Sequence, residues 1–156
     1  MRIRGSLILL ASLLIITMMA GSAGAGRTFV VQWDKAWLST LSPVVTEDGG
    51  ILLVNGKKAV KLNASGETSW EWAAPAVITS ITDDAKGGAW AAYGGVISKL
   101  ESNGKLMWSY AHNDHIYSLE GLPGGEVTAG TDKGVLLLSA KGKFLWFFDP
   151  TAGCDI

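Results

Sequence analysis

Apolar and polar residues alternate along most of this chain in short runs, and glycine-containing turns separate the runs. Between Gly87 and Tyr110, three runs follow one another, with breaks at Gly94-Gly95 and at Ser102-Asn103-Gly104. Alternation with a period of two residues predicts half-buried β-strands, and paired glycines predict tight hairpin turns between them. The chain after its N-terminal segment shows no helical periodicity. This pattern predicts an all-β protein.

The same pattern occurs three times along the chain, since it also fills Gly49–Trp72 and Gly124–Phe148. The residues that mark the repeat are the turn glycines Gly66, Gly104 and Gly142 and the tryptophans Trp70, Trp108 and Trp146. In both series the step from the first member to the second equals the step from the second to the third. A fixed period that is four strands long is typical of the blades of a β-propeller.

Each repeat is expected to form one blade of four strands, ordered from the propeller axis to the rim. The blades are expected at about 39–72, 77–110 and 116–148. The strands expected within them are 40–45, 50–54, 59–63 and 68–72, then 77–82, 88–92, 96–101 and 106–110, then 116–119, 125–129, 135–139 and 144–148. Phe29–Trp33 also alternates, and Trp33 precedes Trp70 by nearly the same interval, which predicts an extra N-terminal strand. The predicted fold is a partial β-propeller of three four-stranded blades plus this strand.

Three blades do not close a ring, because propellers usually have four to eight. We therefore expect the chain to be part of a longer propeller. The alternative is that two copies pair into a six-bladed ring. The sheets at the two ends of such a stack would have open apolar faces, which predicts self-association through those faces.

The fourth strand of each repeat carries two aromatic residues on one face. The pairs are Trp70 with Trp72, Trp108 with Tyr110, and Trp146 with Phe148. A buried aromatic side chain removes about 150–250 Å² from water. We therefore expect these residues, and Trp33 with them, to anchor neighbouring sheets to one another. The alternative is an aromatic platform for a sugar or a quinone.

The N-terminal segment has the features of an export signal. Arg2 and Arg4 precede the apolar run Leu7–Ala20, and Ala23-Gly24-Ala25 fits the cleavage pattern. This predicts a signal peptide at residues 1–25 and a propeller segment at 26–156 that is secreted, periplasmic or on the cell surface. An uncleaved signal would instead anchor the protein in a membrane.

Charge argues against nucleic-acid binding, and the cysteine content argues against an internal disulfide and a lipid anchor. Lys and Arg number 13 against 14 Asp and Glu, so the chain has no basic excess for binding nucleic acid. Cys154 is the single cysteine, so it forms no disulfide within the chain. It also lies far from the N-terminus, where a lipid-attachment cysteine would be expected.

One cluster contains residue types that bind ligands or metals. His112, Asp114 and His115 lie in the connection between the second and third repeats. Two imidazoles and a carboxylate could hold a ligand or an ion such as zinc. However, the matching connection before the second repeat is Ala74-Pro75-Ala76-Val77, so the repeat does not require such residues. The alternative is a polar surface loop.

The repeats resemble the PQQ-like β-propeller family, whose blades occur in quinoproteins. The matching segments are Val60–Trp70, Ser98–Trp108 and Leu136–Trp146. Each has an apolar strand, a polar position, a turn glycine and a tryptophan four residues later. The polar position, which is often aspartate in the dehydrogenases of the family, is Asn63, Glu101 and Ser139 here. This departure makes the chain less similar to the enzymes of the family.

The motif of the family is specific for the fold and hardly specific for function. Our interpretation is a rigid scaffold that binds a protein or another extracellular ligand without catalysis and without a cofactor. An enzymatic role stays open: the chain could be the N-terminal part of a PQQ-dependent dehydrogenase, which would bind PQQ and calcium. The family also includes outer-membrane assembly factors, but the lipid-attachment cysteine typical of those lipoproteins is missing here.

Overall fold

The computed structural model describes residues 38–151, and this part of the chain contains twelve β-strands and no helix. The strands are β1 (Val44–Val45), β2 (Ile51–Asn55), β3 (Lys58–Leu62), β4 (Thr68–Ala73), β5 (Ser80–Asp83), β6 (Ala89–Tyr93), β7 (Val96–Leu100), β8 (Leu106–Ala111), β9 (Ile116–Gly121), β10 (Val127–Thr131), β11 (Val135–Leu138) and β12 (Phe144–Phe148). They form three sheets, β1 to β4, β5 to β8 and β9 to β12, in which neighbours in sequence pair antiparallel.

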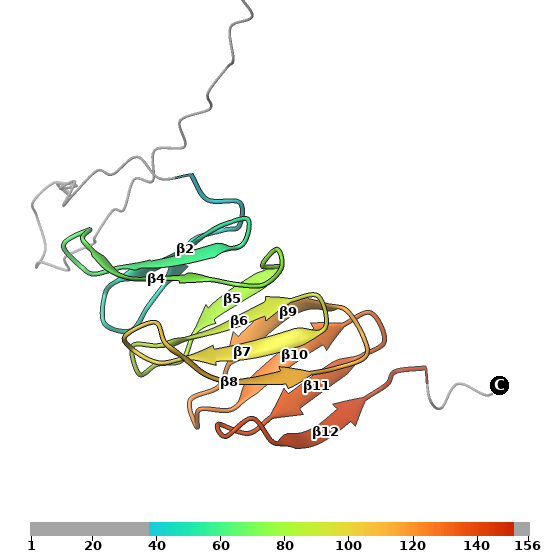
Figure 1. The fold of residues 1–156 in the computed structure, drawn as a ribbon. Helices are drawn as coiled ribbons and strands as arrows, with labels where there is room; N and C mark the ends of the chain where they lie inside the picture. The colour runs from blue at the N-terminus through green and yellow to red at the C-terminus, as the bar shows by residue number, and fades with distance from the viewer. Residues whose placement is uncertain (1–37, 152–156) are drawn as a thin grey trace, which may run out of the picture.

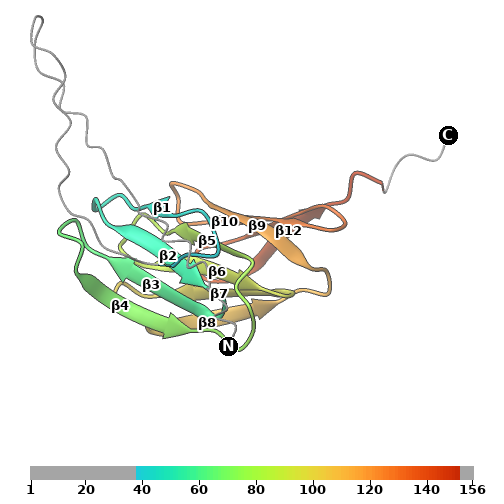
Figure 2. The same cartoon turned by 90° about the horizontal axis from the view of Figure 1, so that it is seen from above.

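The three sheets follow one another in space as blades do. Figure 1 shows them in sequence, from the cyan and green first sheet to the orange and red third sheet. In Figure 2, β1 and β5 lie on one side of the stack, and β4 and β8 lie on the other. The first strand of the second blade, β5, contacts both β1 and β9, so the three first strands line a common axis. The predicted partial propeller of three four-stranded blades is confirmed. The predicted signal peptide, the strand Phe29–Trp33 and Cys154 lie outside the described residues.

The first strands of the first two blades begin later than the sequence predicts. The expected strand 40–45 is reduced to β1, which is only Val44–Val45. Pro43 has no N–H to donate to a neighbouring strand, so it interrupts the ladder. Thr40 instead donates its backbone N–H to the Val54 carbonyl at 2.6 Å, outside the regular pairing. Likewise β5 begins at Ser80, because the N–H of Ile78 donates to Gly56 of the first blade rather than to its own sheet.

The hydrophobic core lies between the sheets. One cluster joins the first blade to the second and contains Leu52 and Val54 on one side and Ala89, Ala91 and Tyr93 on the other. A second cluster joins the second blade to the third. Its members include Trp90, Ile97, Val127, Leu136 and Leu138. Because a strand alternates its side chains between two faces, the middle strands of the second blade contribute to both junctions.

At both junctions, a tryptophan of one blade lies against a turn glycine of the next. A Cβ added at Gly104 would lie 2.8 Å from Cβ of Trp70, and one added at Gly142 would lie 2.6 Å from Cε3 of Trp108. The two glycines have φ of +79° and +74°, a conformation that L side chains adopt at a cost. Glycine is therefore required twice over, for the shape of the turn and for the space that the ring fills.

Gly104→Ala is expected to destabilise the protein more than Gly94→Ala. Both positions have positive φ, so both substitutions cost about 1 kcal/mol of backbone strain. No atom lies within 4 Å of an added Cβ at Gly94, whereas Trp70 blocks that position at Gly104. The overpacking adds about 1–3 kcal/mol at Gly104. Urea denaturation of the two variants measures the difference in free energy of unfolding, and equal losses would contradict this packing.

Candidate functional site

The inner ends of the three blades enclose a cleft, which we call the axial cleft. Its volume is about 410 Å³, which is within the usual range for a binding site of roughly 300–1,000 Å³. It is lined by residues 44, 45 and 47 of the first blade, 81–85 of the second and 119–123 of the third. Each blade therefore contributes the end of its first strand and the turn that follows. The cleft exists because the blades are stacked, since no single repeat forms it.

Carboxylates dominate the charge of the axial cleft. Glu47, Asp83, Asp84 and Glu120 line it, and no Lys or Arg is among the lining residues. Asp84 forms an ion pair with Lys99. Among residues 38–151, no ion pair neutralises the other three carboxylates. The cleft therefore favours a cationic group, and Val44, Ile81 and Leu119 add apolar walls.

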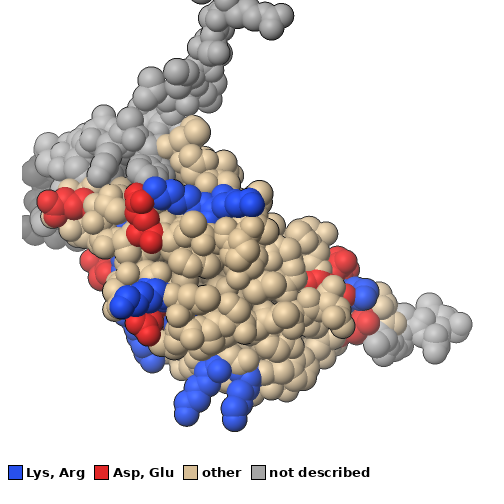
Figure 3. Space-filling model, in the orientation of Figure 1, with Lys and Arg blue, Asp and Glu red and all other residues tan. Residues whose placement is uncertain are grey.

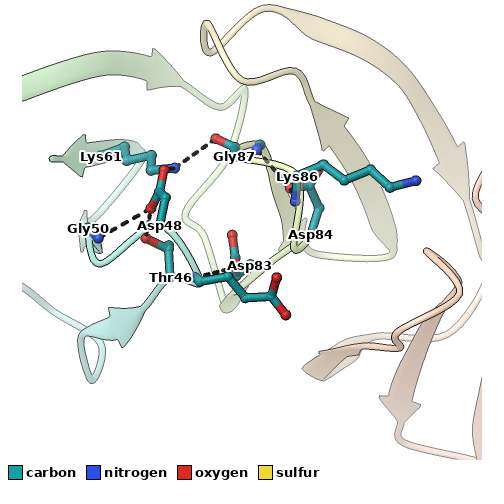
Figure 4. A network of polar contacts seen from close by, with 10 residues as sticks. Thr46, Asp48, Gly50, Lys61, Asp83, Asp84, Lys86 and Gly87 are labelled. Carbon is teal, nitrogen blue, oxygen red and sulfur yellow. Dashed lines mark hydrogen bonds and ion pairs between the residues drawn. The ribbon is translucent and has the colours of Figure 1, made fainter. Parts of the chain in front are cut away.

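Asp83 has one satisfied and one unsatisfied carboxylate oxygen. Its Oδ2 accepts a hydrogen bond of 3.0 Å from the backbone N–H of Glu47, which ties the second blade to the turn of the first (Figure 4). Its Oδ1 is buried and has no hydrogen-bond partner in the described part of the chain. Leaving such an oxygen without a donor costs about 1–3 kcal/mol.

A buried lysine fixes the turn that forms the first wall of the cleft. Lys61 is 3% exposed, and its Nζ lies 2.6 Å from Oδ2 of Asp48. The same ammonium donates to the carbonyl of Gly87 in the second blade at 2.9 Å. Asp48 in turn accepts from the hydroxyl of Thr46 and the N–H of Gly50. Figure 4 shows this network reaching from one blade to the next.

The second blade has a similar pair of a buried lysine and an aspartate, but its aspartate occupies a different position in the repeat. Lys99 lies one period after Lys61 and pairs with Asp84, whose Oδ1 accepts the N–H groups of Lys86 and Gly88. Burial lowers the pKa of Lys99, although Asp84 opposes this effect. The Lys99 ammonium also lies 4.3 Å from the ring centroid of Trp90, a cation–π contact.

The third blade lacks the buried pair. Its sequence has Leu122 and Leu137 one period after Asp84 and Lys99. Sequence reasoning missed the two pairs, although a lysine recurring at a fixed place in the third strand was a visible signal.

The structure brings together two of the three residues in the predicted ligand cluster. His112 Nε2 lies 3.1 Å from Oδ2 of Asp114, and Lys133 Nζ lies 2.7 Å from Oδ1 of the same carboxylate. The hydrogen bond from Lys133 is the main cause that lowers the pKa of Asp114. His115 is exposed, and its ring contacts Tyr117 at 4.7 Å between centroids. Ligand binding by these residues stays a prediction.

Two kinds of feature were sought in the described part of the chain, a metal-binding cluster and a membrane-spanning helix. Within residues 38–151, no group of three or more His, Cys, Asp or Glu side chains is arranged to hold a metal ion. The same residues include no helix of the length and apolar character needed to cross a membrane.

Acid is expected to weaken the protein through Asp48. Its pKa is lowered to about 2, first by the hydrogen bond from Lys61 and then by that from Thr46. In an unfolded chain the pKa is about 3.9, so folding favours the charged form. This stabilisation is complete above about pH 4 and is lost as the pH falls towards 2. Because the Asp48 side chain is 53% exposed, we expect it to contribute about 1 kcal/mol or less.

The measurement is the free energy of urea unfolding from about pH 5 to about pH 2. Asp48→Asn should flatten part of the acid-induced decline, whereas Glu101→Gln, outside this network, should leave it unchanged. Parallel curves for the wild type and Asp48→Asn would show that the Lys61 contact does not stabilise the charged carboxylate.

Known proteins resemble this chain in structure and not in sequence. No protein-family model and no curated protein matches it. BamB from Moraxella catarrhalis superposes with a TM-score of 0.66 at 18% identity, over 76% of this chain and 40% of that one. Streptogramin B lyase superposes with a TM-score of 0.59 at 18% identity, over 69% and 39%. A protein of unknown function from Bacteroides caccae superposes with a TM-score of 0.56 at 16% identity, over 85% and 57%.

The chain therefore spans less than two thirds of each of these proteins. Identities this low show a likeness of fold alone. The three successive four-stranded sheets and these likenesses together establish that the chain has the architecture of part of a β-propeller.

Proposed function

We propose that this protein is a non-enzymatic propeller scaffold of the PQQ-like type, acting outside the cytoplasm, whose axial cleft binds a segment of a partner protein. The segment would carry a Lys or Arg side chain next to apolar residues. The observation that carries this proposal is the cleft itself, which is lined by apolar side chains and by four carboxylates, three of which form no ion pair with any of residues 38–151. The PQQ-like type is supported by the three copies of the strand, turn and tryptophan pattern, and the location by residues 1–25.

A cationic side chain would match both the charge and the hydrogen bonding of the cleft. Glu47 and Glu120 come from different blades, so a guanidinium or ammonium between them would be attracted by both. Glu47 and Glu120 are exposed, so their carboxylate oxygens can accept hydrogen bonds from such a group. The walls at Ile81 and Leu119 would contact the apolar neighbours of that side chain.

The cleft is also built to keep its shape when a partner binds. Its first wall is held by the Lys61 network, and its second wall is held by the Asp84–Lys99 pair. A site that is rigid before binding loses less conformational entropy on association. This rigidity favours a binding role and is independent of any catalytic group.

Peptide selection against the purified protein tests the proposal. A displayed library of random peptides is selected on the immobilised chain, and the dissociation constants of the selected peptides are measured by calorimetry. The selected peptides are expected to be enriched in Lys or Arg flanked by apolar residues. Their affinity should fall about tenfold or more when Glu47→Gln, Asp83→Asn and Glu120→Gln are combined, since charge-assisted hydrogen bonds contribute about 1.5–3 kcal/mol each.

A second triple variant with the same change of net charge is the control. Glu67→Gln, Glu71→Gln and Glu101→Gln remove three carboxylates that do not line the axial cleft. Binding to this variant should match that of the wild type. Equal weakening in the two triple variants, or selected peptides without basic residues, would contradict binding in the cleft.

A further inference from the structure

The outer strands of the second and third blades begin with two successive apolar residues that are exposed. Leu106 and Met107 begin β8 and are 51% and 52% exposed. Phe144 and Leu145 begin β12 and are 50% and 48% exposed. Successive side chains of a regular strand point to opposite faces, so the neighbouring strand and sheet would be expected to cover one of each pair. The backbone has to depart from regular pairing at these two places.

A β-bulge at the start of each outer strand provides this departure. The pairing of β7 with β8 shifts between Lys99 and Leu100, which leaves Met107 without a partner of its own. The pairing of β11 with β12 shifts in the same way, and here Leu145 is the extra residue. Bulges at the edge of a sheet change the direction of a side chain. Each bulge therefore allows both apolar side chains of a pair to reach solvent.

The exposure of these pairs belongs to their position in the repeat and not to the open end of the stack. The third blade packs directly against the second, since Trp108 lies against Gly142. Nevertheless Leu106 and Met107 stay half exposed. A following blade therefore leaves this position uncovered, and the matching pair of β12 is exposed to nearly the same extent.

The first blade shows that the fold does not require apolar residues at the bulge. It has the same shift in pairing, but its bulge carries Thr68 and Ser69, and Glu67 precedes them. One and two periods later, Lys105 and Lys143 stand in place of the glutamate. The second and third blades thus have lysine followed by two apolar residues where the first blade has an acid followed by two hydroxyl residues. This change is concentrated on one side of the molecule.

The turns before these bulges have a surplus of positive charge. Lys105, Lys141 and Lys143 are exposed, and none of them forms an ion pair with any of residues 38–151. The acidic residue of the two turns is Glu101. In Figure 3, basic side chains project from the lower margin of the molecule, below the place of β12 in Figure 1.

The two turns adjoin and form one surface. Met107 of the second blade and Ala140 of the third line the same hollow, which has a volume of about 390 Å³. Lys86 also lines this hollow without an ion pair in the described part of the chain, whereas Lys99 is paired with Asp84. We call the surface the rim patch, and it consists of Lys105, Leu106, Met107, Lys141, Lys143, Phe144 and Leu145.

We propose that the rim patch binds the surface of a membrane that contains anionic phospholipid. The four apolar side chains enter the boundary between headgroups and acyl chains, and the three ammonium groups lie against the phosphates. Exposed Phe and Leu next to Lys is the combination that binds such surfaces, because apolar burial and attraction to anionic lipid add up. The aliphatic stems of the lysines can be buried while their charges stay at the headgroups.

A membrane suits this surface better than a folded protein does. The apolar side chains project from the edges of two blades, and a fluid bilayer adapts to such projections. A protein would have to offer matching hollows at the spacing of the two bulges. The rim patch shares no residue with the lining of the axial cleft, so this inference does not depend on the proposed peptide binding.

A fluorescent label at the bulge tests the proposal in the full chain. In a Cys154→Ser background, Met107→Cys or Leu145→Cys is labelled with the environment-sensitive dye NBD. The matched control is Ser69→Cys, which places the dye at the same position of the first blade. Vesicles of phosphatidylglycerol mixed with phosphatidylcholine should brighten and blue-shift the dye at residues 107 and 145 and leave it unchanged at residue 69. Vesicles of phosphatidylcholine alone should have a much weaker effect.

Substitutions by the residues of the first blade measure what the patch contributes. In the chain labelled at residue 145, Leu106→Thr, Met107→Ser and Phe144→Thr together should raise the lipid concentration at half-maximal shift about tenfold or more. Lys105→Glu with Lys143→Glu should do the same, and the effect should shrink at high salt. Urea midpoints should stay near that of the parent chain, because the first blade carries these residues at the same bulge.

The control for charge is Lys57→Glu with Lys58→Glu, which makes the same change of net charge in the hairpin between β2 and β3. This variant should respond to vesicles as the parent chain does. Residues 1–25 are the same in every variant, so binding through them would shift none of the labels selectively. Equal responses at residues 69 and 145, or no response at residues 107 and 145, would overturn the proposal. A shift that appears without vesicles as the protein concentration rises would also overturn it and assign the rim patch to a second copy.

Discussion

The contact between an indole ring of one sheet and a left-handed glycine of the next is the constraint on which this structure depends. It occurs at both described junctions, with Trp70 on Gly104 and Trp108 on Gly142. A single four-stranded sheet cannot bury both of its faces, so the core has to form between sheets. The glycine allows the turn to approach the ring closely, and this contact sets how each blade is placed against its neighbour.

The sequence predicts the blades well because their determinants are local and repeated. The turn glycines and the tryptophans recur at a constant interval, and the alternation between them is enough to place the strands. The exception is the start of the first two blades. Pro43 was visible in the sequence, but the hydrogen bond from Thr40 to Val54 depends on the path of the chain between strands. Such tertiary contacts have no periodic signature.

The axial cleft could not be predicted in the same way, because it combines turns that lie far apart in the chain. Lys61 and Lys99 keep the period, but their partners Asp48 and Asp84 stand at different distances from the paired glycines that follow. When the repeats are aligned on their glycines and tryptophans, Asp48 and Asp84 therefore do not fall at the same position. The histidine cluster was visible in the sequence, but the contacts of its members were not. His112 and His115 are neighbours in sequence, yet the residue that joins His112 at the Asp114 carboxylate is Lys133, from the next blade.

A double-mutant cycle between Trp108 and Gly142 tests the central contact most directly. Trp108→Leu, Gly142→Ala and the combination are compared with the wild type by their free energies of unfolding. An added Cβ at Gly142 would meet ring atoms of Trp108 that leucine lacks, so the alanine should cost less in the Trp108→Leu background, with a coupling energy of about 1–2 kcal/mol. Strictly additive losses would contradict the contact and, with it, the way the blades are held together.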